Sequence, residues 1–206
     1  MKTILCFGDS NTYGYIPGSG ERYPRDVRWP GRLQKLLGEG YYVVEEGLNG
    51  RTTAFGDDIE PYRKGLDYIL PCVMSHSPVD LIIIMLGTND IKERYHVCAE
   101  EIGYGMEEVV MKITGYFQFR EQKPQIMIVA PVPIGETDSV EFTAQSIEKS
   151  RRLAPIYQEL AERFGCHFLD AADYVKGLGC DKIHYDPQHH AALCEGIGNR
   201  VKEILK

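Results

Sequence analysis

The sequence has no long apolar run and no excess of positive charge. No segment approaches the roughly 20 apolar residues that a membrane-spanning helix needs, so contact with a membrane is not expected. The formal net charge is -7, from 23 Lys and Arg against 30 Asp and Glu. Binding to a phosphate backbone needs clustered Lys and Arg, so we expect no nucleic-acid partner and favour a small-molecule substrate.

Paired cysteine motifs and an export signal are also missing. The six cysteines form no C-x-x-C pair, and several lie inside apolar stretches, as free buried thiols commonly do. The apolar start of the chain is interrupted by Gly8-Asp9-Ser10 before the apolar core of an export signal could develop. These features predict a reduced, cytoplasmic setting.

The 206 residues suffice for one domain with a full core but not for two of ordinary size, so we predict a single domain, residues 1–206. Short β-rich runs alternate with longer amphipathic segments. The strands are expected at residues 3–7, 42–45, 81–86, 125–130 and 166–169, and the helices at 28–37, 62–76, 100–119, 140–164 and 188–205. The run 81–86 is apolar on both faces, which suits the centre of a parallel sheet. The prediction is a three-layer α/β/α fold, with a flavodoxin-like doubly wound parallel sheet of about five strands.

In such a sheet, ligands bind where the strands end, so the residues that follow each strand are the ones to read for chemistry. After the first strand, residues 8–14 read Gly-Asp-Ser-Asn-Thr-Tyr-Gly, which places the Ser10 hydroxyl on a tight turn. A serine there can be a nucleophile. Taken alone, an Asp-Ser-Asn triplet is more typical of a helix N-cap formed by Ser10 or Asn11.

Two further segments follow the same logic. Gly87-Thr88-Asn89-Asp90 follows the third strand, where Asn89 can point an amide N–H into the crevice, or can simply form an Asx-turn. Asp181-Lys182-Ile183-His184 precedes the last helix, and its spacing lets the carboxylate reach the imidazole N–H. A lone D-x-x-H is otherwise typical of a charged surface loop.

These blocks together, with Gly50, resemble the four ordered motifs of the SGNH (GDSL-type) hydrolases over nearly the whole chain. Within that family the sequence most resembles bacterial arylesterases and acyltransferases that also perform perhydrolysis. The resemblance implies Ser10 as nucleophile, with Asp181 and His184 completing a triad. It also implies an oxyanion hole made by the Asn89 side chain, the Gly50 N–H and the Ser10 N–H.

Two positions depart from the family pattern. Lys182 stands where the family often has Gly, which places a cation beside the Asp-His couple. Around Asn49 and Gly50 the subfamily tends to have Ser-Ala, so the backbone N–H is expected to survive while its assignment to Gly50 is open by one residue.

The expected activity is serine-dependent hydrolysis of small carboxylic esters through an acyl-enzyme, with acyl transfer to an alcohol or peroxide as a second outcome. A carbohydrate deacetylase or a lysophospholipase could use the same triad, and a non-catalytic flavodoxin-like binding module is the alternative from another class. Specificity is expected to depend on the loops 15–25, 56–63 and 131–140. Candidates for substrate contacts or apolar walls are Asn11, Tyr13, Tyr15, Trp29, Ile134, Phe142 and Ile183, although ordinary core packing explains each aromatic equally well.

No cofactor or metal is expected, because no set of His, Cys and Asp has zinc-like spacing in the sequence. His76 and His96 are interpreted as surface-turn residues, and His189 and His190 as structural residues at the start of the last helix. The subfamily resemblance further implies a homo-oligomer.

Overall fold

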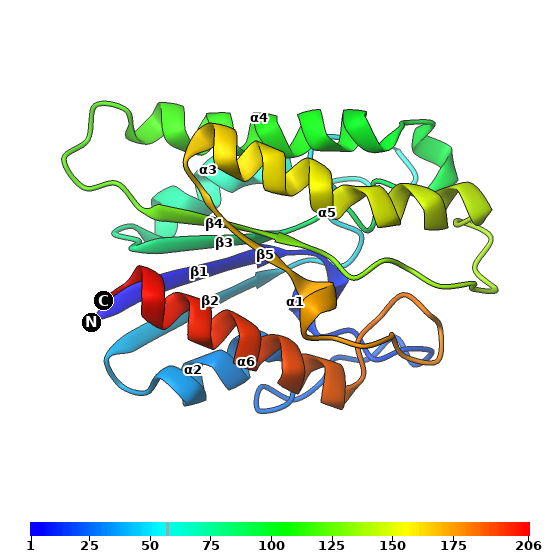
Figure 1. The fold of residues 1–206 in the computed structure, drawn as a ribbon, viewed down its shortest axis with the longest axis horizontal. Helices are drawn as coiled ribbons and strands as arrows, with labels where there is room; N and C mark the ends of the chain where they lie inside the picture. Colours follow the sequence, from blue (N-terminus) through cyan, green and yellow to red (C-terminus); the bar gives the residue numbers. More distant parts are fainter. Residues whose placement is uncertain (57) are drawn as a thin grey trace.

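The computed structural model describes residues 1–56 and 58–206; Asp57, in one of the loops expected to govern specificity, lies outside the described residues. The described chain forms a five-stranded parallel sheet in the order β2-β1-β3-β4-β5 (Figure 1). The strands are β1 (Lys2–Gly8), β2 (Tyr41–Gly47), β3 (Leu81–Met85), β4 (Gln125–Ala130) and β5 (His167–Asp170). This arrangement confirms the predicted fold class.

Helices cover both faces of the sheet (Figure 1). The upper layer in that view holds α3 (Gly65–His76), α4 (Ala99–Phe117) and α5 (Ala144–Phe164), and the lower layer holds α2 (Trp29–Leu37) and α6 (Pro187–Ile204). Three short turns, α1 (Ser10–Tyr13), η1 (Glu93–Tyr95) and η2 (Ala171–Asp173), follow strand ends or loops. None of the described helices combines the length and apolar character required to traverse a bilayer.

Strand β3 lies at the centre because its side chains are apolar on both faces. Ile82 and Ile84 belong to the core cluster with α3, α4 and α5, whereas Leu81, Ile83 and Met85 belong to the cluster with α2 and α6. All five are buried. A strand of this composition can only be satisfied when both faces are covered, which is the reason the chain forms three layers.

Most predicted boundaries fall within a few residues of the observed ones, and the exceptions have local causes. Helix α3 begins at Gly65 rather than at 62, because Tyr62 has a positive φ of 67° and Lys64 forms a bridge with Thr52. Helix α5 begins at Ala144 rather than at 140, because the Thr143 hydroxyl caps it by accepting hydrogen bonds from the N–H groups of Gln145 and Ser146.

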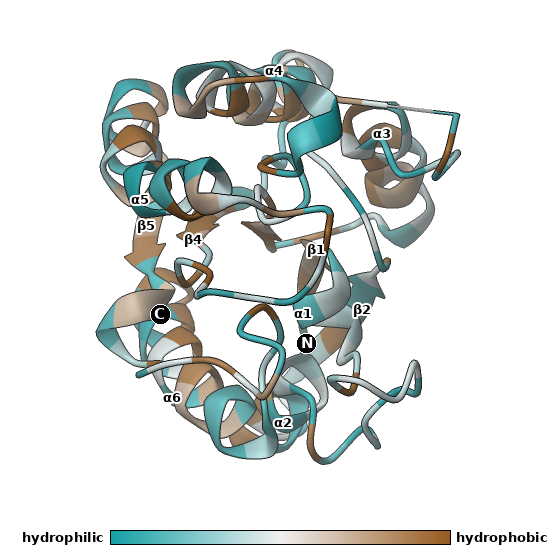
Figure 2. Cartoon of the chain, turned by 90° about the vertical axis from the view of Figure 1, so that its right-hand side faces the viewer, coloured by the Kyte–Doolittle hydropathy of each residue, from teal (hydrophilic) through white to brown (hydrophobic). Residues whose placement is uncertain are grey.

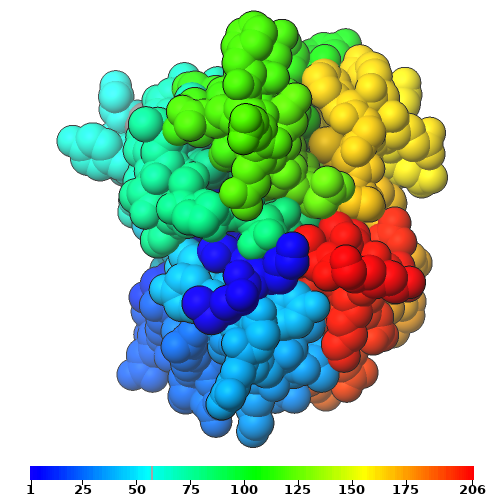
Figure 3. Space-filling model, turned by 90° about the vertical axis from the view of Figure 1, so that its left-hand side faces the viewer, coloured from blue at the N-terminus to red at the C-terminus, as the bar shows by residue number. Residues whose placement is uncertain are grey.

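The carboxyl ends of the strands lie together at one end of the molecule. Figure 2 looks onto this end, where hydrophobic strand residues are enclosed between the two helical layers and the connecting loops lie in front. Figure 3 shows the opposite end, with the two chain termini side by side on the surface. The loops that carry the chemistry are thus far from both termini.

Candidate active site

The loop after β1 presents the Ser10 hydroxyl at the mouth of a cavity. Asp9 is the N-cap of α1, and its carboxylate accepts a hydrogen bond from the Asn11 N–H at 2.9 Å. Gly14 ends this single turn in the left-handed region, with φ 84°. Ser10, the first residue of the turn, accepts hydrogen bonds at its carbonyl oxygen from the N–H groups of Gly14 and Tyr15, and it lines the cavity.

Ser10, His184 and Asp181 form a continuous chain of hydrogen bonds. His184 Nε2 lies 2.9 Å from Ser10 Oγ, and His184 Nδ1 lies 2.6 Å from Asp181 Oδ2. The ring of Tyr15 lies against the imidazole, with the ring centroids 4.5 Å apart. Residues 174 positions apart in the sequence thus meet at hydrogen-bonding distance.

The Asp181 carboxylate is held by its own loop. Its Oδ1 accepts hydrogen bonds from the backbone N–H groups of Ile183 and His184, at 3.0 and 2.9 Å. Burial alone would raise the pKa of this carboxyl, but the hydrogen bonds from His184 and Ile183 outweigh it and lower the pKa to about 2. Asp181 is therefore an anion across the neutral range and can stabilise a positive imidazolium.

The loop that carries His184 is anchored to the first loop by Asn11. The Asn11 amide donates to the Ile183 carbonyl at 3.3 Å and accepts from the Tyr185 N–H at 3.1 Å. Lys182, in the same loop, has a left-handed φ of 62°. This conformation explains why glycine suits the position, and the lysine accepts it at a cost of about 1 kcal/mol.

The three residues with the N–H donors expected from the sequence, Ser10, Gly50 and Asn89, all line this cavity. The Asn89 side chain lines the cavity, and its Nδ2 donates to the Arg51 carbonyl at 3.1 Å, which leaves its second N–H available. Gly50 lies in the cavity wall with φ 78°, a conformation that favours glycine. Within residues 1–56 and 58–206, the backbone N–H groups of Ser10 and Gly50 have no hydrogen-bond acceptor.

Two buried carboxyl groups, those of Asp9 and Asp90, lie in the loops that follow β1 and β3. Asp90 Oδ1 accepts from the Thr53 N–H at 2.8 Å and from the Thr53 hydroxyl. Burial raises the pKa of both Asp9 and Asp90 to about 6, despite the hydrogen bonds that each accepts. The charge of Asp9 adds to the rise in the pKa of Asp90.

The cavity has a volume of about 680 Å³, and a group of paired charged side chains forms part of its wall. Lys92, with a side chain that is 6% exposed, lies 2.8 Å from Glu60 and 3.1 Å from Glu141. Arg94 pairs with the same two carboxylates. Although partial burial would raise the pKa of Glu60, its bonds to Lys92 and Arg94 lower it. Four charges therefore join loop 56–63 to the segment before α5.

The predicted substrate contacts fall into two groups. Tyr15, Phe142 and Ile183 line the cavity together with Ser10. Tyr13, Trp29, Ile134 and Asn11 do not line it.

The second group requires a correction of the sequence-based assignment. Trp29, the first residue of α2, is buried in the core cluster with α6, and Ile134 is buried in the core cluster with α3, α4 and α5. The Tyr13 ring is covered by the Arg22 guanidinium, with Cζ 4.2 Å from the ring centroid. Asn11 is buried and links two loops instead of facing the cavity.

Sequence reasoning did not single out the charged wall. Lys92, Glu60 and Glu141 are charged residues in loops, and such residues are usually solvated. The one available signal was the position of Lys92, two residues after the Asn89-Asp90 block at the end of β3.

Comparison with known proteins identifies similar chains. The GDSL-like lipase/acylhydrolase family matches residues 6–192. An aryl esterase from M. smegmatis is 33% identical, with a TM-score of 0.93, over 99% of this chain and 100% of that one. A carbohydrate acetylesterase from Sinorhizobium meliloti is 34% identical, with a TM-score of 0.94, over the same shares of the two chains.

A curated relative is more distant. It is an acetylxylan esterase from Xylanibacter ruminicola, 24% identical in an alignment of 199 positions that covers 90% of this chain. The chain spans 39% of the length of that relative.

Proposed function

Because the chain belongs to the GDSL-like lipase/acylhydrolase family, we propose that it hydrolyses small carboxylic esters with Ser10 as nucleophile, His184 as base and Asp181 as its partner. The chain is a hydrolase, so the non-catalytic binding module considered from the sequence is rejected. The observation that carries the proposed roles is the hydrogen-bonded chain from Ser10 Oγ through His184 to Asp181 at the open cavity.

In the first half of the reaction, Ser10 Oγ attacks the ester carbonyl carbon while its proton moves to His184 Nε2. The Nδ1–H of His184 stays with His184 and is shared with Asp181, which stabilises the imidazolium without accepting the proton. The alcohol leaves with the proton from Nε2, and the acyl group remains on Ser10.

In the second half, a water molecule attacks the acyl carbonyl carbon and gives its proton to His184 Nε2. The carboxylic acid leaves as Ser10 Oγ recovers the proton. In both halves negative charge develops on the carbonyl oxygen. The proposed donors to it are the Asn89 side chain and the N–H groups of Gly50 and Ser10, and their common place in the cavity lining supports this role.

The lining of the cavity favours one substrate class among those open from the sequence. Lys92, Glu60 and Glu141 offer charged donors and acceptors to hydroxyl groups, and a long acyl chain would lie against them unfavourably. We therefore favour short acyl groups on polyhydroxylated alcohols, that is, carbohydrate deacetylation, over lysophospholipid hydrolysis. The charged wall also retains water, so hydrolysis should exceed acyl transfer.

The test is a series of p-nitrophenyl esters from acetate to octanoate, together with acetylated xylo-oligosaccharides. We expect kcat/KM to fall with chain length and acetate to be released from the oligosaccharides. The Ser10→Ala variant should lose on the order of 10⁶ in kcat, and mass spectrometry after an organophosphonate should locate the label on Ser10. A labelled wild-type peptide without Ser10 would contradict the assignment.

The cytoplasmic setting, the homo-oligomer and the acyltransferase activity stay predictions. Cell fractionation and light scattering test the first two. For the third, a short alcohol added to an aryl acetate assay would divert product from acid to ester.

A further inference from the structure

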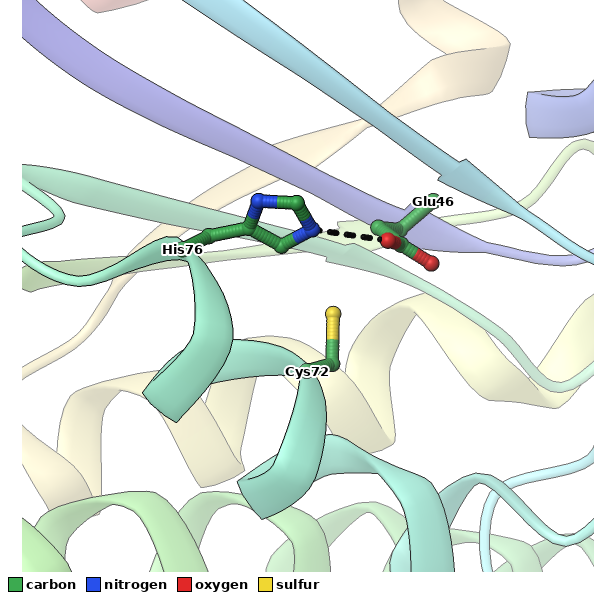
Figure 4. Close-up of side chains that lie close together, drawn as sticks. All are labelled: Glu46, Cys72 and His76. Atoms are coloured by element: carbon green, nitrogen blue, oxygen red, sulfur yellow. Dashed lines mark hydrogen bonds and ion pairs between the residues drawn. The ribbon is translucent and has the colours of Figure 1, made fainter.

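A second group of chemically reactive side chains lies outside the proposed active site. Glu46 comes from β2, and Cys72 and His76 come from α3. One oxygen, sulfur or nitrogen atom from each lies within 4.8 Å of the other two. Figure 4 shows the Cys72 sulfur pointing toward the hydrogen bond that joins His76 to Glu46. Among the described residues, this is the cluster of three such groups with a geometry that could hold a metal.

We propose that Glu46, Cys72 and His76 form a binding site for a divalent cation of the zinc type. The ligand set combines a thiolate, an imidazole and a carboxylate, and this mixture suits zinc rather than calcium or magnesium, which prefer oxygen ligands. The site lies apart from the proposed catalytic residues, so its function is additional to ester hydrolysis.

The helix supplies two ligands in the spacing that a metal needs. Cys72 and His76 are four residues apart near the carboxyl end of α3, so their side chains share one face of the helix. That face is turned toward β2, where Glu46 lies one residue before the end of the strand. The three ligands therefore come from two rigid elements.

Only a small adjustment would bring the three atoms to coordination distance. In a tetrahedral zinc site, ligand atoms lie about 3.3–3.6 Å apart, from metal–ligand bonds of about 2.0–2.3 Å. His76 Nε2 and Glu46 Oε1 are already 2.9 Å apart across a hydrogen bond. A metal would take the place of the proton between these two atoms and push them slightly apart, while the Cys72 rotamer draws the sulfur closer. The neutral His76 ring then carries its proton on Nδ1, so the imidazole loses no proton.

Proton and charge balance are satisfied by simple exchange with solvent. Burial, aided by the Glu46 charge, raises the pKa of the Cys72 thiol to about 12, so without metal the thiol is protonated. On binding, the S–H bond breaks, the proton leaves to solvent and a bond from sulfur to the metal forms. The thiolate and the Glu46 carboxylate together then neutralise the divalent cation.

An entry route exists beside the cluster. Glu46, Arg51 and Tyr68 also line a separate cavity of about 760 Å³, from which a cation could reach the Glu46 carboxylate. The Arg51 guanidinium in this wall donates to the Glu46 carbonyl and to the Gly8 carbonyl. The positive charge of Arg51 repels a cation. Once the Cys72 thiolate and the Glu46 carboxylate neutralise the divalent cation, this repulsion is small.

This proposal departs from the sequence-based expectation of no metal. Glu46 is 26 positions before Cys72, so no linear motif links them, and only the packing of α3 against the end of β2 brings them together. The competing interpretation is that His76 and Glu46 form a simple ion pair at the end of α3.

Titration with Co²⁺ distinguishes the two interpretations, because cobalt bound to a thiolate gives a charge-transfer band that an imidazole–carboxylate pair cannot give. The experiment uses the full chain with Cys98→Ser and Cys180→Ser, since both thiols are exposed and would compete. We expect one equivalent of Co²⁺ to bind with that band, and Zn²⁺ to displace it and raise the Tm.

The matched variants decide the outcome. Cys72→Ser should abolish the charge-transfer band, and His76→Gln and Glu46→Gln should each weaken Co²⁺ binding more than about tenfold. His96→Gln, at an exposed histidine outside the cluster, should change nothing. If Cys72→Ser fails to fold, the half-exposed His76 still provides the test. A wild-type spectrum without the band, or binding unchanged in His76→Gln, would overturn the proposal.

Discussion

The two sides of the cavity are built in different ways. On one side, backbone N–H groups hold the Asp181 carboxylate, and the Asn11 side chain links the loop of Ser10 to the loop of His184. Ser10 itself follows the end of the buried strand β1. On the other side, Lys92 and Glu141 are held by ion pairs that join two loops. Backbone bonds fix a side chain more tightly than pairs between long charged side chains do.

This contrast suggests a division of labour. A proton transfer tolerates little displacement, so the reacting groups need the rigid side. Recognition of an alcohol tolerates several arrangements, so the charged side can be replaced residue by residue at a small cost. The variants below test that division, from the largest expected effect to the smallest.

Asp181→Asn should lower kcat by about 10⁴, because the amide keeps the shape but leaves His184 without its anionic partner and in the wrong tautomer. Steady-state kinetics with p-nitrophenyl acetate measures the loss. Asp138→Asn, an exposed position on the cavity rim, is the control. A loss of kcat under tenfold in Asp181→Asn would contradict the role of Asp181 as the partner of His184.

Asn89→Ala should lower kcat by about 10² to 10³ and leave KM nearly unchanged, because one donor to the developing oxyanion is lost. The comparison is with Thr137→Ala, which shortens another polar side chain of the same cavity. Equal turnover in Asn89→Ala and the wild-type protein would refute the donor role.

Lys92→Met should raise KM for an acetylated oligosaccharide about tenfold, the value of one lost hydrogen bond to a charged group, with kcat little changed. For p-nitrophenyl acetate, which offers no hydroxyl groups, KM should stay the same. Lys176→Met, at an exposed lysine outside the cavity lining, controls for a general charge effect. A large fall in kcat of Lys92→Met for both substrates would contradict the division between catalysis on one side of the cavity and recognition on the other.

Asp90→Asn should change the pH dependence of stability rather than the reaction. The folded pKa of Asp90 is raised to about 6 from 3.8, so between about pH 4 and 6 the folded state binds more protons than the unfolded state. Stability therefore falls as pH rises through that window, by up to about 3 kcal/mol for this group.

The Asp90→Asn variant has no carboxyl group at this position, so it should lack the part of the loss of stability that the ionisation of Asp90 causes. Urea unfolding at pH 4, 5, 6 and 7 measures it, with Asp26→Asn at an exposed carboxylate as control. Asp181 acts in the opposite sense, because its lowered pKa stabilises the fold above about pH 4 and that stabilisation is lost as pH falls toward 2. Parallel curves for Asp90→Asn and the wild-type protein would contradict the raised pKa. A single transition throughout would also support the predicted single domain.

Prediction from the sequence succeeded where a local pattern carries the information. The apolar run at 81–86 indicated a central strand, and short motifs after the strands selected Ser10, Asn89 and the Asp181–His184 couple, which the structure places around one cavity. Trp29 and Ile134 were misplaced because an aromatic or branched side chain fits a core and a cavity wall equally well. Lys92 was missed because its pairing partners lie in other loops.

The sequence by itself determined the order of strands and helices along the chain. The spacing of apolar residues that marks a helix or a strand is a property of residues close together in the sequence. The sequence also supplied the chemical groups at the strand ends. Only the tertiary structure decided which loop residues face the cavity, which carboxyl groups are buried, and that Glu46 meets Cys72 and His76. Those outcomes depend on contacts between segments far apart in the chain, and desolvation and charge pairing act across such contacts without leaving a local pattern.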